Sequence, residues 1–350
     1  YSQMRSEKEQ VVSLVKRVLL DLVSVYTPSG EESKARETLE RIAGYLDLPL
    51  RVDDTNSYYF GKGNERFLLA SHIDTVPGYL PPFDDGNAVG GRGAVDAKGP
   101  LSAMLVASSL LRKEGCEVEV AALSDEEAFS KGAKKLATSG RSFDFVVIGE
   151  PTSTTGIGIE YRGVMHLDIK CKSTSAHASS GQANVIMKAA EGLQKVYSPP
   201  KEYDTPTITP TIFRSGEAIN VIPSEAYLHL DVRFSARNDP EVILKGIVET
   251  FRDCEVTVTE RLEPVRVSPN NQLVRAVMRA LLKQGQKPNL VRKWGTSDMN
   301  ILYKVSKEIV AYGPGDSRLE HTDYERITYE ELYIGTMTYY NTIKDLCEKY

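Results

Sequence analysis

The sequence has few cysteines, no long hydrophobic run and no block of basic residues. Its four cysteines are far apart and form no Cys-x-x-Cys pair, which argues against a disulfide framework and a thiolate zinc site and suits a reducing cytoplasm. The longest apolar stretches, such as Phe67 to Ala70 and Phe145 to Ile148, fall far short of the ~20 residues of a membrane helix. Lys and Arg number 43 against 48 Asp and Glu, a net charge of −5, so we expect no nucleic-acid partner.

The composition is that of an ordinary globular protein, with 26% charged and 41% hydrophobic residues. At ~150 residues per domain, a chain of 350 residues suggests two domains. We expect a cytoplasmic protein without a secretory signal. The three residues that precede Met4 are not expected to belong to the fold.

The two ends of the chain alternate apolar runs with helical patterns, which predicts an α/β domain. The expected helices cover 11–26, 32–46, 98–114, 126–138, 272–284 and 329–348, and the expected strands cover 67–70, 118–123, 145–148 and 308–312. Thr328 and Glu331 have the spacing of a capping box at the start of the last helix.

The middle of the chain has a different pattern, because apolar and polar residues alternate there with period two, as in a sheet with one covered face. Strands are expected over 163–172, 207–214, 226–234 and 255–259, with helices over 184–197 and 240–251. This order is a βαββαβ unit inserted into the first domain.

Only five residues are histidines, and they fall into two groups. His166 and His229 lie on the polar side of alternating strand patterns, where we expect solvated or interface side chains rather than functional ones. His72, His177 and His321 lie in polar, turn-rich segments beyond apolar runs, where open α/β folds place their ligands.

Several acidic residues follow strands or glycine turns in the same way as these histidines. The residues are Asp74, Asp96, Glu126, Glu127 and Glu150. Each alone fits an ordinary structural role, such as a loop acid, a helix N-cap, an acid at a helix N-terminus or a turn.

Taken together with His72 and His321, these acids form an oxygen and imidazole ligand set that suits two divalent ions such as Zn²⁺, Co²⁺ or Mn²⁺. Two ions need a bridging carboxylate, and a further acid must take a proton from the attacking water. Glu126 beside Glu127 can be that acid. Asp74, two residues after His72 on an extended segment, can hold the histidine ring.

Five segments resemble the signature of the M20 family of metallopeptidases and deacylases, which includes acetylornithine deacetylase, succinyl-diaminopimelate desuccinylase and glutamate carboxypeptidases. The segments are 71–77, 91–99, 125–127, 149–151 and 320–322. The resemblance implies a three-layer α/β, Zn-peptidase-like catalytic domain over 4–159 and 264–350. It also implies an inserted α+β lid or dimerisation domain, βαββαβ and ferredoxin-like, over 160–263.

The resemblance further implies two metal ions per subunit, Zn²⁺ or Co²⁺, and a role for each matching residue. One ion would be held by His72 and Glu150 and the other by Glu127 and His321, with Asp96 as the bridge. Glu126 would be the general base, and Asp74 would orient His72.

The lid would contribute further residues to the site. His177 resembles a lid histidine that polarises the substrate carbonyl, often from the other subunit of a dimer, so a homodimer through the lid is expected. The positions that resemble substrate-binding residues of the family are Arg162, Asn220, Arg233, Gly295 and Thr296.

One branch of the family, the [LysW]-lysine and [LysW]-ornithine hydrolases, is most similar to this chain in the amino-acid sequence of four segments. These segments are 90–101, 159–163, 295–302 and 312–317. The substrate of these hydrolases is lysine or ornithine whose α-amino group is acylated by the γ-carboxyl of the C-terminal glutamate of the carrier protein LysW. Its hydrolysis is the last step of lysine or arginine biosynthesis through α-aminoadipate. The resemblance therefore implies LysW as a partner.

Three alternatives stay open. An N-acetylornithine deacetylase or N-succinyl-diaminopimelate desuccinylase would act on a small acyl group. A carboxypeptidase or dipeptidase would share every metal ligand and differ in the lid pocket. A binding protein with an inactive centre would hold no metal.

Overall fold

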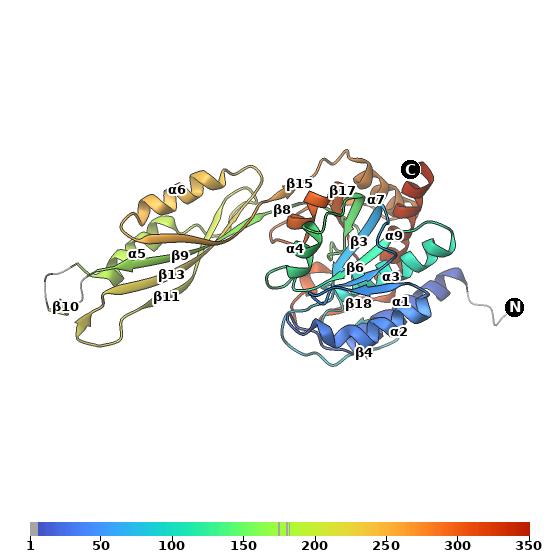
Figure 1. The fold of residues 1–350 in the computed structure, drawn as a ribbon, viewed down its shortest axis with the longest axis horizontal. Helices are drawn as coiled ribbons and strands as arrows, with labels where there is room; N and C mark the ends of the chain where they lie inside the picture. Colours follow the sequence, from blue (N-terminus) through green and yellow to red (C-terminus); the bar gives the residue numbers. More distant parts are fainter. Residues whose placement is uncertain (1–5, 174–175, 180, 182) are drawn as a thin grey trace. The chain divides into compact units, whose positions relative to one another are not determined.

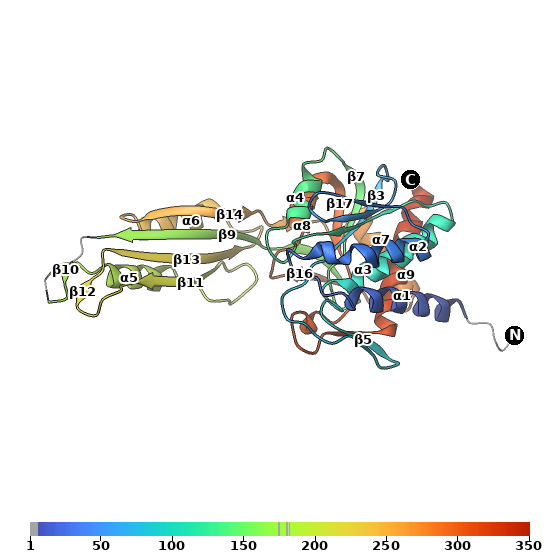
Figure 2. The same ribbon diagram turned by 60° about the horizontal axis from the view of Figure 1, so that its bottom comes forward.

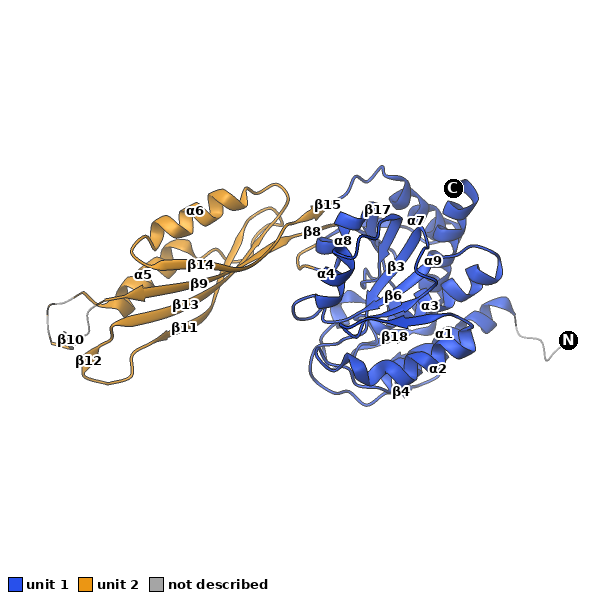
Figure 3. Cartoon of the chain, viewed as in Figure 1, with its two compact units in different colours: residues 1–159, 267–292, 297–350 blue, residues 160–266, 293–296 orange. Residues whose placement is uncertain are grey.

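The computed structural model describes residues 6–173, 176–179, 181 and 183–350, and the chain divides into two compact units (Figure 3). Unit 1 comprises the residues up to Ile159 together with Val267–Arg292 and Ser297–Tyr350. Unit 2 comprises Glu160–Arg266 and Lys293–Thr296. The chain therefore leaves unit 1 after Ile159 and returns to it at Val267.

A mixed sheet forms the centre of unit 1 (Figure 1). Its strand order is β1-β2-β6-β3-β7-β17-β8. Its strands are β1 Leu50–Val52, β2 Tyr58–Phe60, β3 Phe67–His72, β6 Glu119–Leu123, β7 Phe143–Ile148, β8 Gly156–Tyr161 and β17 Ser306–Ala311. β3 runs parallel to β6 and β7, and β17 runs parallel to β7. Two short strands, β15 Val265–Arg266 and β16 Asn289–Lys293, pair with β8. Every residue of β3 and β6 is buried, which explains their nearly continuous apolar sequence.

Helices pack around this sheet and bury one large apolar core. They are α1 Glu7–Val23, α2 Arg36–Leu46, α3 Lys98–Lys113, α4 Lys131–Ala137, α7 Gln272–Lys283, α8 Met299–Leu302 and α9 Tyr329–Lys349, with 3-10 turns η1 Glu32–Ala35, η2 Tyr303–Val305 and η3 Ser317–Leu319. α1, α3 and α9 pack on one another, and α7 packs on α9. The predicted capping box at Thr328 is present. The predicted α/β architecture is confirmed.

The helix expected over 126–138 is shorter than predicted and begins only at Lys131. Asp125 and Ser130 have left-handed backbone conformations, with φ of 67° and 53°. The Asp125 carboxylate accepts hydrogen bonds from the N–H groups of Phe129 and Lys131. A local turn therefore replaces the first helical residues.

A small sheet beside the main one has the order β18-β5-β4. Its strands are β4 Phe83–Asp84, β5 Ala88–Gly90 and β18 Arg326–Thr328. Arg326 pairs with Gly90, so the chain after β5 and the chain before β18 lie side by side.

Unit 2 contains an antiparallel sheet with the order β11-β13-β9-β14 (Figure 2). Its elements are β9 Gly163–Lys172, α5 Val185–Val196, β11 Thr207–Ser215, β13 Glu225–Phe234, α6 Pro240–Thr250 and β14 Glu255–Leu262, beside a pair of short strands, β10 Ala176–His177 and β12 Val221–Ile222. The predicted βαββαβ order is present. Both helices pack on the apolar face of the sheet, and the other face is polar.

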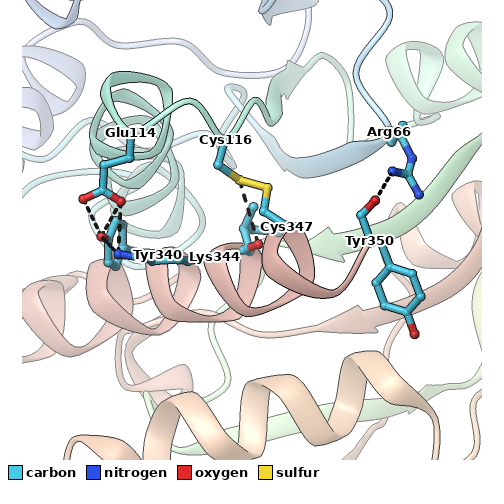
Figure 4. The surroundings of a disulfide bond; sticks show 8 residues. Arg66, Glu114, Cys116, Tyr340, Lys344, Cys347 and Tyr350 are labelled. Carbon is cyan, nitrogen blue, oxygen red and sulfur yellow. Dashed lines mark hydrogen bonds and ion pairs between the residues drawn. A yellow bond between two sulfur atoms is a disulfide. The ribbon is translucent and has the colours of Figure 1, made fainter.

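The expectation that the cysteines form no disulfide is wrong. Cys116 bonds to Cys347 (Figure 4), and Cys171 bonds to Cys254. The partners are 231 and 83 residues apart in sequence, but the fold brings their Cα atoms to 6.1 and 4.4 Å, within the usual range for disulfides. Sequence spacing could not show this, because the pairing depends on the packing of α3 against α9 and of β9 against β14.

Among the described residues, none of the helices combines the length and the apolar character that crossing a bilayer would require.

Candidate metal centre

The predicted ligands of unit 1 meet at one edge of the main sheet, because the parallel strands β3, β6, β7 and β17 all end there. His72 is the last residue of β3, Glu126 and Glu127 follow β6, and Glu150 follows β7. Asp96 precedes α3 and His321 follows η3. Three overlapping groups of ligand atoms lie within 4.8 Å of one another: His72 with Asp96 and Glu150, His72 with Glu126 and Glu127, and Asp96 with Glu127 and His321.

His72 is fully buried and its two ring nitrogens face different partners. Nδ1 lies 2.8 Å from the carbonyl oxygen of Asp74. A hydrogen on Nδ1 would be donated to this oxygen. Nε2 lies 3.0 Å from a carboxylate oxygen of Asp96 and 3.3 Å from those of Glu126 and Glu150. In this tautomer the Nε2 lone pair points at carboxylates, a position in which a bound cation would be stabilised.

Asp96 lies between the two histidines. One carboxylate oxygen faces Nε2 of His72, and the other lies 2.8 Å from Nε2 of His321. His321 Nε2 is also 3.1 Å from Glu127. His321 has a left-handed backbone with φ of 65° and a half-exposed side chain. Asp96 therefore has the position of a bridging ligand.

Too many acids are buried here for the two imidazoles to neutralise. Burial raises the pKa of Glu127 to about 8 and that of Glu150 to about 7, against the opposing effects of His321 and His72 respectively. Burial also raises the pKa of Glu126 well above its usual value, and the carboxylates of Glu150 and Glu127 add to this effect. Such a cluster is stabilised by cations, and its oxygen and nitrogen donors fit Zn²⁺ or Co²⁺.

Asp74 connects the two sides of the cluster. Its carboxylate oxygens accept hydrogen bonds from the backbone N–H groups of Glu126 and Glu127 at 3.0 Å each, and from Ser29 Oγ at 2.6 Å. It also lies 3.4 Å from His72 Nδ1. Burial acts to raise the pKa of Asp74, but the contact with His72 and these donors lower it. Asp74 is thus fixed against both the histidine and the loop that carries the two glutamates.

Sequence reasoning missed three buried acids around the centre. Glu325 accepts hydrogen bonds from the backbone of the segment that leads to Asp96. Glu32 accepts one from the N–H of Asp125, beside the glutamate loop. Burial raises the pKa of Asp298 to about 8, although His72 opposes this effect. Only Glu325 carried a usable signal, because it lies four residues after His321 in the same polar segment.

The remaining predicted site residues all belong to unit 2. The backbone of His177 pairs with Val221 in the β10–β12 ladder, but its side chain lies outside the described part of the chain. Arg162 donates to the carbonyl of Trp294 at 2.8 Å, beside the predicted residues Gly295 and Thr296.

Two more predicted substrate-binding residues lie in unit 2. Both Nε and Nη2 of Arg233 contact the Asp231 carboxylate, at 2.8 and 3.1 Å. Asn220 is exposed, and its carbonyl accepts a hydrogen bond from the N–H of Ala178. The substrate roles of the unit 2 residues stay predictions.

The sequence model that describes peptidase family M20/M25/M40 matches residues 68–345 of this chain. The chain belongs to this family. The resemblance seen in the sequence is therefore confirmed, and with it the prediction of a metal-dependent amide hydrolase. The family match covers unit 2 as well as every residue of the candidate centre in unit 1.

Two curated relatives match this M20 chain over almost its whole length. A protein of Sulfurisphaera tokodaii named [LysW]-lysine/[LysW]-ornithine hydrolase is 49% identical over 346 residues, 99% of each chain. A protein of Saccharolobus solfataricus with the same name is 46% identical over 347 residues, 99% of this chain and 100% of the relative.

Solved structures confirm the M20 fold. A tripeptidase from Staphylococcus aureus superposes with a TM-score of 0.84 at 21% identity, covering 96% of this chain and 99% of the other. An M20 family metallo-carboxypeptidase from Sulfolobus solfataricus gives 0.76 at 17% identity, covering 97% and 99%. At these identities the likeness concerns the fold alone.

Proposed function

We propose that this protein hydrolyses the amide bond between the α-amino group of lysine or ornithine and the γ-carboxyl of the C-terminal glutamate of the carrier protein LysW. The observation that carries the proposal is the 49% identity, over 99% of both chains, with a relative named [LysW]-lysine/[LysW]-ornithine hydrolase. The products would be free lysine or ornithine and the regenerated carrier. Such a biosynthetic role supports a cytoplasmic location.

We propose two divalent ions, Zn²⁺ or Co²⁺, at the candidate centre. His72 and Glu150 would hold one and Glu127 and His321 the other, with Asp96 as the bridge. Support comes from the overlapping ligand groups and from the carboxyl groups that burial leaves hard to ionise. When bound, the ions would supply Lewis-acid polarisation of the amide and a lowered pKa for the attacking water.

Glu126 is the proposed general base. Its carboxylate lies 3.3 Å from His72 Nε2, inside the cluster, and burial raises its pKa from the usual range. A base whose pKa is moved towards neutrality can take a proton from water and then give it to the leaving α-amine. Asp74 would keep both His72 and the Glu126 backbone in place. His177 would stabilise the developing oxyanion.

The residues of unit 2 would bind the amino-acid part of the substrate and join two subunits into a homodimer. Arg162 and Arg233 are the proposed partners of a substrate carboxylate, because a guanidinium can form two parallel hydrogen bonds with it. Asn220, Gly295 and Thr296 would complete this binding surface.

The test is release of free amino acid by the Zn²⁺- or Co²⁺-loaded enzyme from a panel of substrates. The panel holds LysW-γ-lysine, LysW-γ-ornithine, N-acetylornithine, N-succinyl-diaminopimelate and a dipeptide. We expect a strong preference for the two carrier-linked substrates. Faster hydrolysis of a small acyl substrate or of the dipeptide would overturn the proposed substrate and leave the centre unaffected.

The Glu126→Gln variant tests the chemistry separately. We expect it to lose about 10²–10⁴-fold in rate with its metal content unchanged, because Glu126 is not a proposed ligand. Glu117→Gln is the matched control, since Glu117 is an exposed glutamate that pairs with Lys62 on the surface. Full activity of Glu126→Gln would refute the assignment of the base.

A further inference from the structure

The polar face of the unit 2 sheet carries the same three-residue pattern on two neighbouring strands. His166-Leu167-Asp168 lies in β9 and His229-Leu230-Asp231 lies in β13. The strands are antiparallel and in register, so His166 is opposite Asp231, Leu167 opposite Leu230 and Asp168 opposite His229. Both leucines are fully buried in the apolar core. The two histidines and two aspartates therefore share the opposite, polar face.

The two histidine rings face each other across the ladder. Nδ1 of His166 lies 2.9 Å from Nε2 of His229, and the rings are stacked with centroids 5.1 Å apart. The outer nitrogen of each ring points towards an aspartate. His229 Nδ1 is 2.7 Å from Asp168, and His166 Nε2 is 3.9 Å from Asp231. The histidine side chains are 29% and 17% exposed, so an ion can reach them from solvent.

Both aspartates are held in place by a second donor. Tyr227 donates its hydroxyl to Asp168 at 2.8 Å. Arg233 forms its two hydrogen bonds with Asp231. The carboxylates are thus fixed beside the rings and do not depend on the histidines for their position. On the other side of β9, Thr257 of β14 lies opposite Asp168 and Glu260 lies opposite His166.

Two neutral imidazoles leave one outer ring nitrogen without a hydrogen to donate to its aspartate. His229 Nδ1 must carry a hydrogen to donate to Asp168, which leaves Nε2 of His229 as an acceptor for Nδ1–H of His166. Nε2 of His166 then has no hydrogen and turns its lone pair towards the carboxylate of Asp231. The contact between the rings and the contact with Asp168 are satisfied, whereas His166 Nε2 lies 3.9 Å from Asp231, too far for a hydrogen bond.

A divalent ion between the facing nitrogens would give each ring an aspartate as a hydrogen-bond partner. With the ion bound by His166 Nδ1 and His229 Nε2, both outer nitrogens carry hydrogens and each faces an aspartate. This is the carboxylate–histidine–metal arrangement that orients metal-bound imidazoles in proteins. Bonds of about 2.0–2.1 Å at a tetrahedral angle place the two nitrogens about 3.4 Å apart, so the rings need to separate by only about 0.5 Å.

We propose that His166 and His229 form a binding site for a divalent transition-metal ion on the polar face of unit 2, with Asp168 and Asp231 supporting the rings and water completing the coordination. Imidazole nitrogen is a preferred donor for Ni²⁺, Cu²⁺ and Zn²⁺ and a poor one for Mg²⁺ or Ca²⁺. The site shares no residue with the proposed ligands of unit 1.

The experiment is a calorimetric titration of the holoenzyme, with the centre of unit 1 already loaded, using Ni²⁺ alone. We expect one further Ni²⁺ per chain in the parent protein and none in His166→Asn or in His229→Asn. Asp168→Asn should keep the stoichiometry but bind about 10–100-fold more weakly, because it removes the support of His229. Thr257→Ala is the matched control on the same face and should bind as the parent does.

A second readout identifies the ligands. With Cu²⁺ as the probe, the electron paramagnetic resonance spectrum of the extra ion should show coupling to two imidazole nitrogens, and either histidine variant should remove that signal. The proposal is overturned if the parent binds no further ion, or if the histidine variants bind it with the parent's affinity and the same nitrogen coupling.

Discussion

Replacing Glu325 by alanine removes a buried carboxylate on which the position of Asp96 depends. Glu325 is 2% exposed and accepts hydrogen bonds from the backbone N–H groups of Gly93, Val95 and Asp96 at 2.9–3.0 Å, and from Arg92 at 3.1 Å. Arg92 keeps two carbonyl partners in the variant. The three backbone N–H groups would lose the only acceptor that the structure gives them here.

Each buried donor left without a partner costs about 1–3 kcal/mol. Because water can enter the space left by the side chain and satisfy part of the loss, we expect Glu325→Ala to lower the free energy of unfolding of unit 1 by about 3–5 kcal/mol, the cost typical of breaking a buried charged contact. Asp96, the proposed bridging ligand, would lose its fixed position, so metal content and activity should fall together.

The assay must separate the two units, because a chain with two units need not unfold in one step. Hydrogen exchange by mass spectrometry on peptides covering 90–97 should show faster exchange in the variant. The single tryptophan, Trp294, belongs to unit 2, so its fluorescence transition should not shift. Glu330→Ala is the matched control, because Glu330 is an exposed acid that pairs with Lys8 and should contribute less than about 1 kcal/mol.

The reasoning is refuted if Glu325→Ala exchanges these amides at the parent's rate and retains its full metal content. A shift of the Trp294 transition by the same amount as the unit 1 transition would also contradict it, since the effect would then be global.

Three further predictions concern the centre and the disulfides. Asp74→Asn should reduce activity by 10–100-fold with the fold intact, because a ligand's supporting carboxylate is lost; steady-state kinetics and circular dichroism check this. Chelation should lower the melting temperature more at pH 8 than at pH 5. The reason is that Glu127 and Glu150, with pKa values of about 8 and 7 against an ordinary 4.5, hold protons in the metal-free folded state that are lost as pH rises; equal shifts at both pH values would contradict it. Cys116→Ser with Cys347→Ser should lower the free energy of unfolding by up to about 5 kcal/mol, since the bond closes a loop of 231 residues; denaturant titration measures it, and no change would mean that the bond does not form.

The elements of the fold were largely predictable because their signals are local. The period-two pattern placed β9 at residues 163–172, as the structure has it, and the capping box placed the start of α9. Where a side chain competes with the helix for backbone N–H groups, as Asp125 does before α4, periodicity gave a helix that starts too early. β1 and β2, at three residues each, are too short to show any period.

The candidate centre was predictable only as a set of residues. Strand ends and glycine turns identified which acids and histidines lie at the sheet edge, and six of them meet there. Of the supporting acids, only Glu325 had a local signal, its place four residues after His321, and its partners could not be predicted because they depend on the pairing of β18 with β5. Both disulfides were missed for the same reason. The expectation of no disulfide rested on the number and spacing of the cysteines, which do not show which of them the fold brings together.

The parallel pairing of β7 with β17 has a consequence for how the chain is made. All of unit 2 lies between these two strands in the sequence. Unit 2 is nearly contiguous and antiparallel, so it can complete its sheet while β7 still presents an unpaired edge, which is exposed to aggregation during synthesis. His321 is made later still. The metal ions would therefore bind late in the synthesis of the chain, after β17 has paired with β7 and completed the sheet.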